Sequence, residues 1–200
     1  MNQNKELAKK ILPLSLSAIV LLLDQITKAL VVKFIPRLNP FSSEGDGIIN
    51  VLGSALRFIH VRNKAVAFSM GSSLPQNVRA ILFAVIPLIV IILVYVIYFR
   101  NKDFTQTQRW AICGILGGGL GNLVDRFFRP DGVVDFIDCI FFGSIKGASF
   151  PKKGTFSWLS WERWPTFNVA DSAVVVCGII FIITFIVQIV QDSKKSKEEK

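Results

Sequence analysis

The chain contains the stretch AILFAVIPLIVIILVYVIYF at residues 80–99, in which no side chain carries a charge. A helix of this length rises about 1.5 Å per residue and crosses the roughly 30 Å hydrocarbon core of a bilayer. Because 52% of the 200 residues are hydrophobic, the whole chain is too apolar for an ordinary soluble domain. The stretch therefore predicts a transmembrane helix in an integral membrane protein.

Three further stretches are candidates for membrane spans. The first stretch is long and holds a few charged side chains, and these charges also argue against a cleaved signal peptide. The second is short and rich in glycine. The third is apolar along almost its whole length. We predict an all-α membrane protein with four transmembrane helices, the glycine-rich one being weakest by hydropathy. Their predicted bounds are about 11–35, 78–99, 109–127 and 168–190, in a single domain 1–191 followed by a charged cytoplasmic tail 192–200.

The distribution of basic residues predicts the orientation of these helices. The flanking segments 1–10, 100–109 and 191–200 hold 3, 3 and 4 lysines or arginines in 30 residues, whereas the long loops 36–78 and 129–166 hold 4 and 5 in 81 residues. Basic residues accumulate on the cytoplasmic side of a membrane protein. Both termini are therefore expected in the cytoplasm and both loops outside. The net charge of +9 follows from these flanks, so no nucleic-acid partner is expected.

The first outward loop has a pattern typical of strands rather than helices. Apolar and polar residues alternate in segments 48–52 and 56–61, which predicts a small β-rich region between the first two helices, lying at the membrane surface. The single histidine, His60, falls in this region without a second ligand nearby, so we interpret it as an ordinary strand residue. The three cysteines are expected to be small apolar residues rather than a disulfide framework.

Polar residues form stripes at the outward ends of three predicted helices. One stripe has i, i+4, i+7, i+8 spacing, and a carboxylate at the edge of hydrocarbon is costly enough to suggest a functional site. Glycines spaced four apart in the same helix would let other helices approach closely. The stripes are Asp24 and Lys28; Gly118, Asn122, Asp125 and Arg126; and Asn168, Asp171 and Ser172.

These stripes also have a plain structural interpretation. Asp24 and Lys28 could neutralise each other one turn apart, and Arg126 could keep the adjacent Asp125 ionised. Asp135 and Asp171 differ because their neighbours are apolar, a setting that favours the neutral acid. Two such groups close together would act as one acid and one base. The residues alone leave the choice between Asp125 and Asp135 open.

Five motifs, taken in order, resemble those of the bacterial lipoprotein signal peptidases, also called signal peptidase II. They are Asp24-Gln25-x-Thr27-Lys28, Asn63-x-x-x-Ala67-Phe68, Gly118-x-x-Gly121-Asn122-x-x-Asp125-Arg126, Val134-Asp135-Phe136 and Phe167-Asn168-x-Ala170-Asp171. The resemblance implies a four-helix intramembrane aspartic endopeptidase of the bacterial cytoplasmic membrane, with its active site near the outer face. It would remove signal peptides from diacylglyceryl-modified prolipoproteins, cutting before the modified cysteine.

The resemblance also implies roles for individual residues. The catalytic dyad would be Asp135 and Asp171, with no metal and no cofactor, and the partners would be prolipoprotein substrates and membrane lipid. The chain departs from the family pattern at Ala65, where glycine is usual, in one extra residue between Arg126 and Asp135, and in a longer loop between the two dyad aspartates. The residues expected to support the site or bind substrate are Asp24, Lys28, Asn63, Gly118, Asn122, Asp125, Arg126 and Asn168.

Two other functions are alternatives to a peptidase. A small ion-coupled transporter would use intramembrane carboxylates, but it predicts polar residues near the midplane and paired repeats, and neither is visible. A non-catalytic scaffold would not require carboxylates in both motifs.

The outer loop 139–165 interleaves aromatic and basic residues, which predicts a segment on the outer leaflet that helps hold the lipid-modified substrate. A folded cap packed on the protein is the alternative for this loop.

Overall fold

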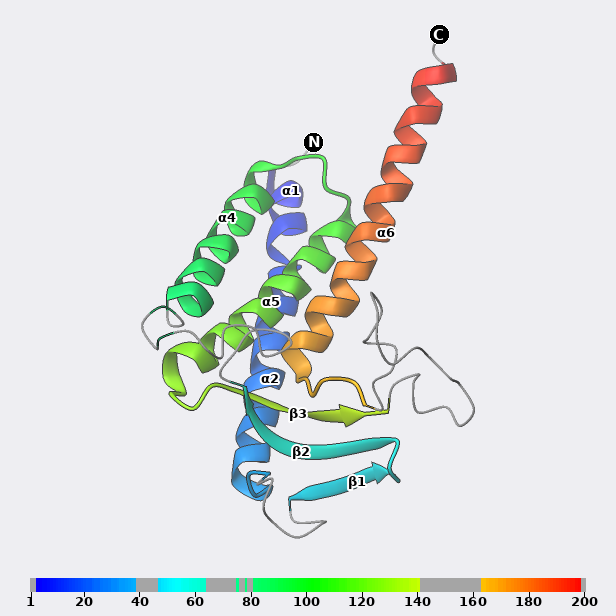
Figure 1. The fold of residues 1–200 in the computed structure, drawn as a ribbon. Coiled ribbons are helices and arrows are strands. Elements are labelled where there is room, and N and C mark those ends of the chain that lie inside the picture. Colours follow the sequence, from blue (N-terminus) through cyan, green and yellow to red (C-terminus); the bar gives the residue numbers. More distant parts are fainter. Residues whose placement is uncertain are drawn as a thin grey trace. The chain divides into compact units, whose positions relative to one another are not determined.

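The computed structural model describes residues 3–38, 47–63, 75, 78, 81–140 and 163–198. These residues fall into two compact units, each described here by itself (Figure 1). The first, the helical unit, comprises residues 1–25, 74–128 and 169–200. The second, the sheet unit, comprises residues 26–73 and 129–168.

The helical unit is built from helices, two of which, α2 and α4, have a proline at or beside their start. Its elements are α1 (Gln3–Ile11), the first part of α2 (Leu14–Phe34), a π-helical turn η2 (Ile81–Val85), α4 (Ile86–Arg100), α5 (Gln106–Phe128) and α6 (Val169–Glu198). Helices α1 and α2 are separated at Pro13, because proline has no N–H group to donate to the preceding turn. Pro87 lies in the first turn of α4, where a missing N–H group costs nothing. Helix α6 continues through the predicted tail as far as Glu198.

Three of these helices are long and apolar enough to cross a membrane: Leu7–Phe34, Leu82–Arg100 and Val169–Ser196. Their apolar side chains are widely exposed, as for Leu22, Ile89 and Ile182, which suits contact with lipid. Helix α5 is the glycine-rich third span of the prediction, and most of its residues are buried against α4 and α6. By length and composition α5 is not among the three, so its crossing of the bilayer stays a prediction.

Glycines on α5 set how closely the other helices approach it. A Cβ atom on Gly118 would lie 2.4 Å from the carbonyl oxygen of Ala170, and one on Gly117 would lie 2.8 Å from the Cα atom of Ser17. Real side chains do not fit at such distances, so α6 and α2 can lie where they do only because glycine occupies these positions. The predicted close approach of helices at these glycines is confirmed.

One end of the helical unit gathers the basic flanks of the chain. Lys10 Nζ donates to the carbonyl oxygen of Phe99 at 2.7 Å, and Gln106 Nε2 donates to that of Lys9 at 3.3 Å. On α6, Gln188 accepts a hydrogen bond from Gln108 Nε2 at 2.8 Å. The N-terminal segment, the α4–α5 connection and the C-terminal part of α6 therefore share one end of this unit (Figure 1).

The sheet unit contains a three-stranded antiparallel sheet in the order β1-β2-β3. The strands are β1 (Ile48–Leu52), β2 (Leu56–Asn63) and β3 (Val133–Cys139). Gly53 turns between β1 and β2 with φ of +56°, a conformation that favours glycine. Strands in the first loop were predicted, but the β-rich region is not confined to it: β3 comes from the segment between α5 and α6. This strand was missed because a short apolar run does not reveal its distant partner.

Candidate active site

The first turn of α6 carries Asp171 and is held by a side chain from α2. A helix start leaves backbone N–H groups without partners inside the helix. Asp24 Oδ1 accepts the hydrogen bond of one of them, the Ala170 N–H, at 3.0 Å. Asp24 is fully buried, so this contact also satisfies a carboxylate that would be costly to bury alone. Asp24 therefore caps the first turn of α6, and its role in supporting a catalytic site stays a prediction.

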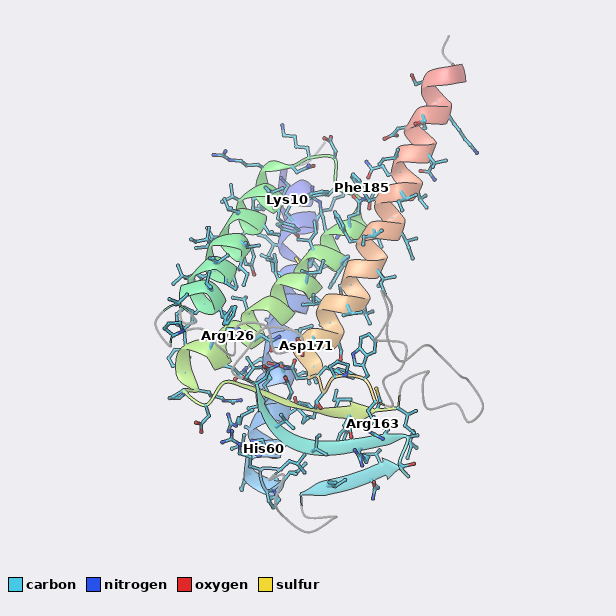
Figure 2. The ribbon with its side chains drawn as sticks, viewed as in Figure 1. Lys10, His60, Arg126, Arg163, Asp171 and Phe185 are labelled. Atoms are coloured by element: carbon cyan, nitrogen blue, oxygen red, sulfur yellow. The ribbon has the colours of Figure 1, made fainter. Side chains whose placement is uncertain are left out.

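Asp171 itself is bound by α5. Asn122 Nδ2 donates to Asp171 Oδ1 at 2.7 Å, and Gly118, one turn earlier, lies against Ala170 on α6. The predicted stripe on α5 therefore faces the start of α6 at these two positions. Figure 2 shows Asp171 at the end of the helical unit opposite Lys10, the end where Arg126 also lies.

The remaining members of the stripe have other partners. Asp125 is fully buried and accepts a hydrogen bond from Gln25 Nε2 at 3.2 Å. The guanidinium carbon of Arg126 lies 5.6 Å from the ring centroid of Phe83, within the range of a cation–π contact.

Gln25 belongs to the first of the five motifs, but the sequence predicted no role for it. Its Nε2 lies 3.1 Å from Asp24 Oδ2, 3.0 Å from the Gly121 carbonyl oxygen and 3.2 Å from Asp125 Oδ1. An amide NH₂ group has two donors and can be shared among these acceptors. Gln25 therefore links two buried aspartates, one on α2 and one on α5. Nothing in the spacing of α2 alone identifies this link, because both α5 acceptors lie about 100 residues away.

Lys28 lies one turn beyond Asp24 on α2, in the part of that helix that belongs to the sheet unit. It is fully buried. Its predicted ion pair with Asp24 stays a prediction.

In the sheet unit, Asp135 is bound by two asparagine amides. Asn63, the last residue of β2, donates from Nδ2 to Asp135 Oδ2 at 3.0 Å. Asn168 donates from Nδ2 to Asp135 Oδ1 at 2.7 Å and is itself fully buried. Because each carboxylate oxygen has a donor, the side chain is held in one orientation and its negative charge is supported. The structure thus brings together three predicted site residues whose positions span more than 100 residues of sequence.

A second buried carboxylate, Asp138, lies three residues further along β3. Arg57 on β2 and Arg163 both form ion pairs with it (Arg163 is labelled in Figure 2). Neither arginine nor Asp138 was predicted as a site residue. The sequence signal was weak, since arginines in an outward loop are usually solvated.

His60 lies in β2, as predicted, but it is buried. Burial lowers the pKa of His60 below its usual value, and Arg62 and Arg37 lower it further by repulsion. Its Nδ1 lies 3.0 Å from the Ile35 carbonyl oxygen, and its Nε2 accepts a hydrogen bond from Arg62 at 3.0 Å. These contacts suit the neutral imidazole with its proton on Nδ1. The described parts of the chain contain no group of metal-ligating side chains.

Two sequence-based expectations fall outside the described residues. Ala65, which replaces the usual glycine, lies in segment 64–74, outside the described part of the chain. Most of the long aromatic and basic loop, residues 141–162, is likewise outside the description.

Comparison with known proteins identifies the family. A family model described as signal peptidase (SPase) II matches residues 16–187 of the chain. The chain belongs to the signal peptidase II family. Its relatives include the lipoprotein signal peptidases of Treponema pallidum, 42% identical over 90% of this chain and 86% of that protein, and of Treponema denticola, 42% identical over 92% and 93%. That of Borrelia duttonii is 43% identical over 83% and 84%.

Solved structures agree with this signal peptidase II assignment at the level of the fold. A bacterial membrane enzyme structure at 2.3 Å resolution is similar with a TM-score of 0.67 and 23% identity, covering 94% of this chain and 93% of the other. A second, at 1.9 Å resolution, has a TM-score of 0.63 and 24% identity, covering 86% and 91%. The protein is a multi-pass membrane peptidase of the aspartic type, and the transporter alternative has no support.

Proposed function

We propose that Asp135 and Asp171 are the catalytic dyad with which this signal peptidase II cuts its substrates. Members of this family remove signal peptides from prolipoproteins, and the substrate bond is the one before the diacylglyceryl-modified cysteine. Neither a metal nor a covalent intermediate takes part. The supporting residues are Asp24, Lys28, Asn63, Gly118, Asn122, Asp125, Arg126 and Asn168.

The observation that carries this proposal is the hydrogen bond from Asn168 to Asp135. Asn168 directly precedes α6, and Asp171 follows it by only three residues. A chain spans at most about 3.3–3.6 Å per residue, so the backbone of Asp171 is within roughly 10 Å of Asn168. One short motif therefore binds one aspartate and contains the other. The short length of chain between Asn168 and Asp171 therefore supports a dyad formed by Asp135 and Asp171.

The chemistry needs one ionised and one protonated carboxyl group. The ionised aspartate accepts a proton from a water molecule, whose oxygen attacks the scissile carbonyl carbon. The protonated aspartate donates a hydrogen bond to the carbonyl oxygen, and the roles reverse when the amine leaves. Asparagine donors at Asp135 and Asp171 hold each carboxyl group in place without adding a competing charge.

The orientation is proposed from the charge pattern and from the contacts inside the helical unit. The basic flanks meet at one end of that unit, and Asp171 lies at its other end (Figure 2). Basic flanks face the cytoplasm, so both termini are cytoplasmic and the site lies near the outer face of the bacterial cytoplasmic membrane.

Substrate recognition is proposed to be largely lateral and apolar. The diacylglyceryl group stays in the bilayer while the peptide enters between the helices, and membrane lipid surrounds the exposed apolar side chains of α2, α4 and α6. The loop 139–165 lies on the outer leaflet and helps hold the lipid-modified substrate. Trimming residues 144–160 should then weaken apparent substrate affinity more than turnover.

The dyad is tested by conservative substitution in the full-length protein. Asp135→Asn and Asp171→Asn should each reduce cleavage of a diacylglyceryl-modified prolipopeptide by about 10²–10⁴-fold, the usual contribution of one acid–base group. Asp131→Asn, an exposed aspartate in the turn before β3, is the matched control and should cleave normally. Most of the activity surviving in either dyad variant would disprove the assignment and make Asp125 the next candidate. Activity should also survive a chelator.

A further inference from the structure

Asp138 is a buried carboxylate of the sheet unit that the proposed chemistry does not use. Its side chain is 3% exposed. Its Oδ1 accepts a hydrogen bond from Arg163 Nε at 2.6 Å, and its Oδ2 accepts one from Arg57 Nε at 2.7 Å. Burying a charged group is favourable only where partners satisfy it. Asp138 therefore connects β2 and β3 with the segment 163–168.

The contacts of Arg163 require one particular arrangement of the surrounding backbone. Besides the Asp138 carboxylate, it donates from Nη2 to the main-chain oxygen of Asp138 at 3.1 Å and from Nη1 to that of Ser54 at 2.9 Å. A guanidinium group is a rigid fork of donors, so it fits only one placement of these three acceptors. The contacts hold Arg163 at a set position along β3.

Strand β2 and the segment 163–168, which both contact Asp138, also bind Asp135. Residues 163–168 run antiparallel to β3, with bridges at Ile140–Arg163 and Ile137–Phe167. They end in Asn168, whose amide reaches Asp135. On the other side β2 starts near Arg57, opposite Asp138, and ends in Asn63, whose amide reaches the other oxygen of Asp135.

Backbone hydrogen bonds of 2.8 to 3.1 Å join Phe167, the residue before Asn168, to Phe136 and Ile137 of β3. Nearer to Arg163 the pairing of this segment with β3 is irregular. Between the two bridges, β3 advances three residues while the other segment advances four. Pro165 lies in this interval and has no N–H group to donate. The ladder is irregular here, and a slip of one residue would move the segment by about 3.3 Å and turn its side chains to the opposite face. Such a slip would remove the 2.7 Å contact between Asn168 and Asp135.

We propose that Asp138 is a positioning residue for peptide cleavage, which acts by holding Arg163, and with it residues 163–168, in register on β3. Asn168 is thereby kept on Asp135, and Arg57 gives the same anchorage to the strand that carries Asn63. Asp138 touches neither substrate nor reacting atoms. The inference rests on the proposed function, since it assumes that Asp135 is catalytic.

A double-mutant cycle separates this role from a purely structural one. Asp138→Asn keeps the shape of the side chain but removes its charge, and Asn168→Ala removes the amide on which the role depends. With a diacylglyceryl-modified prolipopeptide, Asp138→Asn should lower kcat by about tenfold to a hundredfold, the worth of a hydrogen bond to a charged group, and change KM by less than about threefold. In the Asn168→Ala background the same substitution should lower single-turnover cleavage by less than about threefold.

Thermal unfolding of the same proteins supplies the structural readout. Loss of the ion pairs should lower the unfolding temperature equally in both backgrounds, whereas the loss of turnover should nearly vanish in the second. A turnover loss of equal size in both backgrounds would overturn the inference, because Asp138 would then act independently of Asn168. A turnover in Asp138→Asn equal to that of the exposed control Asp131→Asn would overturn it as well.

Two further variants keep the result interpretable. If Asp138→Asn does not accumulate as folded protein, Arg163→Gln is used in its place. The Arg163→Gln substitution removes the contact between Asp138 and residues 163–168 but leaves Arg57 bound to Asp138. The turnover loss caused by Arg163→Gln should depend on Asn168 in the same way. Asp135→Asn measures the proposed function separately: activity in that variant would refute the dyad, whereas an inactive Asp135→Asn beside an unimpaired Asp138→Asn would refute only the positioning role.

Discussion

Asp135 and Asp138 lie three residues apart on β3, and each is bound by one residue of β2 and one residue of the segment 163–168. Asp135 is bound by asparagine amides, and Asp138 by arginine guanidinium groups. This difference in partners matches the two roles proposed above. A neutral amide orients a carboxylate without adding a charge, whereas a guanidinium group adds a charge and a rigid fork of donors.

Asp24 and Lys28 should prove to be energetically coupled. Both are fully buried, so removing either charge alone would take away the opposite charge expected to neutralise the other. We expect Asp24→Asn and Lys28→Met each to lower the free energy of unfolding by about 3–5 kcal/mol. The double variant should be less destabilised than the sum of the two. Strictly additive losses in detergent unfolding experiments would show that the two charges do not interact.

Gln25 should be required for the buried aspartates on α2 and α5 to coexist. Gln25→Leu removes the amide shared by Asp24 and Asp125 and should destabilise the protein by about 1–3 kcal/mol, the cost of leaving buried acceptors unsatisfied. Gln25→Glu adds a third carboxylate and should be worse. Gln191→Leu, on an exposed part of α6, is the control and should leave the unfolding transition unchanged. Equal stability of all three variants would contradict the link.

Gly118 and Gly178 form a matched pair for testing the helix contact. A Cβ on Gly118 would lie 2.4 Å from the Ala170 carbonyl oxygen, whereas a Cβ on Gly178 would meet nothing within 4 Å. Gly118→Ala should force α5 away from the first turn of α6, costing about 1–3 kcal/mol and reducing turnover. Gly178→Ala should be neutral or stabilising by up to about 1 kcal/mol, since alanine favours a helix. Similar effects at both positions would refute the proposed close contact.

His60 should make the stability of the protein fall at mildly acidic pH. Burial lowers the pKa of His60 in the folded state below its unfolded value of 6.5, so the folded state prefers the neutral ring. The contribution of the neutral His60 ring to the free energy of unfolding is complete above pH 6.5. This contribution decreases as the pH falls below 6.5, by at most about 1.4 kcal/mol per pH unit. Because the chain has one histidine, unfolding at pH 7.5, 6.5 and 5.5 reports on this group. The His60→Asn variant should lose less stability over this range; parallel losses would assign the effect to other groups.

Long apolar stretches could be predicted from sequence because burial in lipid depends on local composition. Residues 80–99 and 173–190 must be helical in a bilayer whatever surrounds them, since every backbone polar group must be satisfied within the segment. The glycines of α5 could be predicted as contact positions for a similar reason. The dyad motif was visible only as a resemblance, since spacing did not distinguish Asp135 from Asp125.

By itself, the sequence determined that the protein is a membrane protein, which segments are apolar helices, and which polar residues are too costly in their setting to be incidental. Only the tertiary structure decided that residues 133–139 form a strand, that Gln25 bridges two aspartates, and that Asp138 and two arginines anchor the segment leading to Asn168. The physical reason is range. Hydropathy acts within one turn or one span, whereas β pairing and buried hydrogen bonds join residues 25 to about 100 positions apart, whose meeting no local pattern encodes.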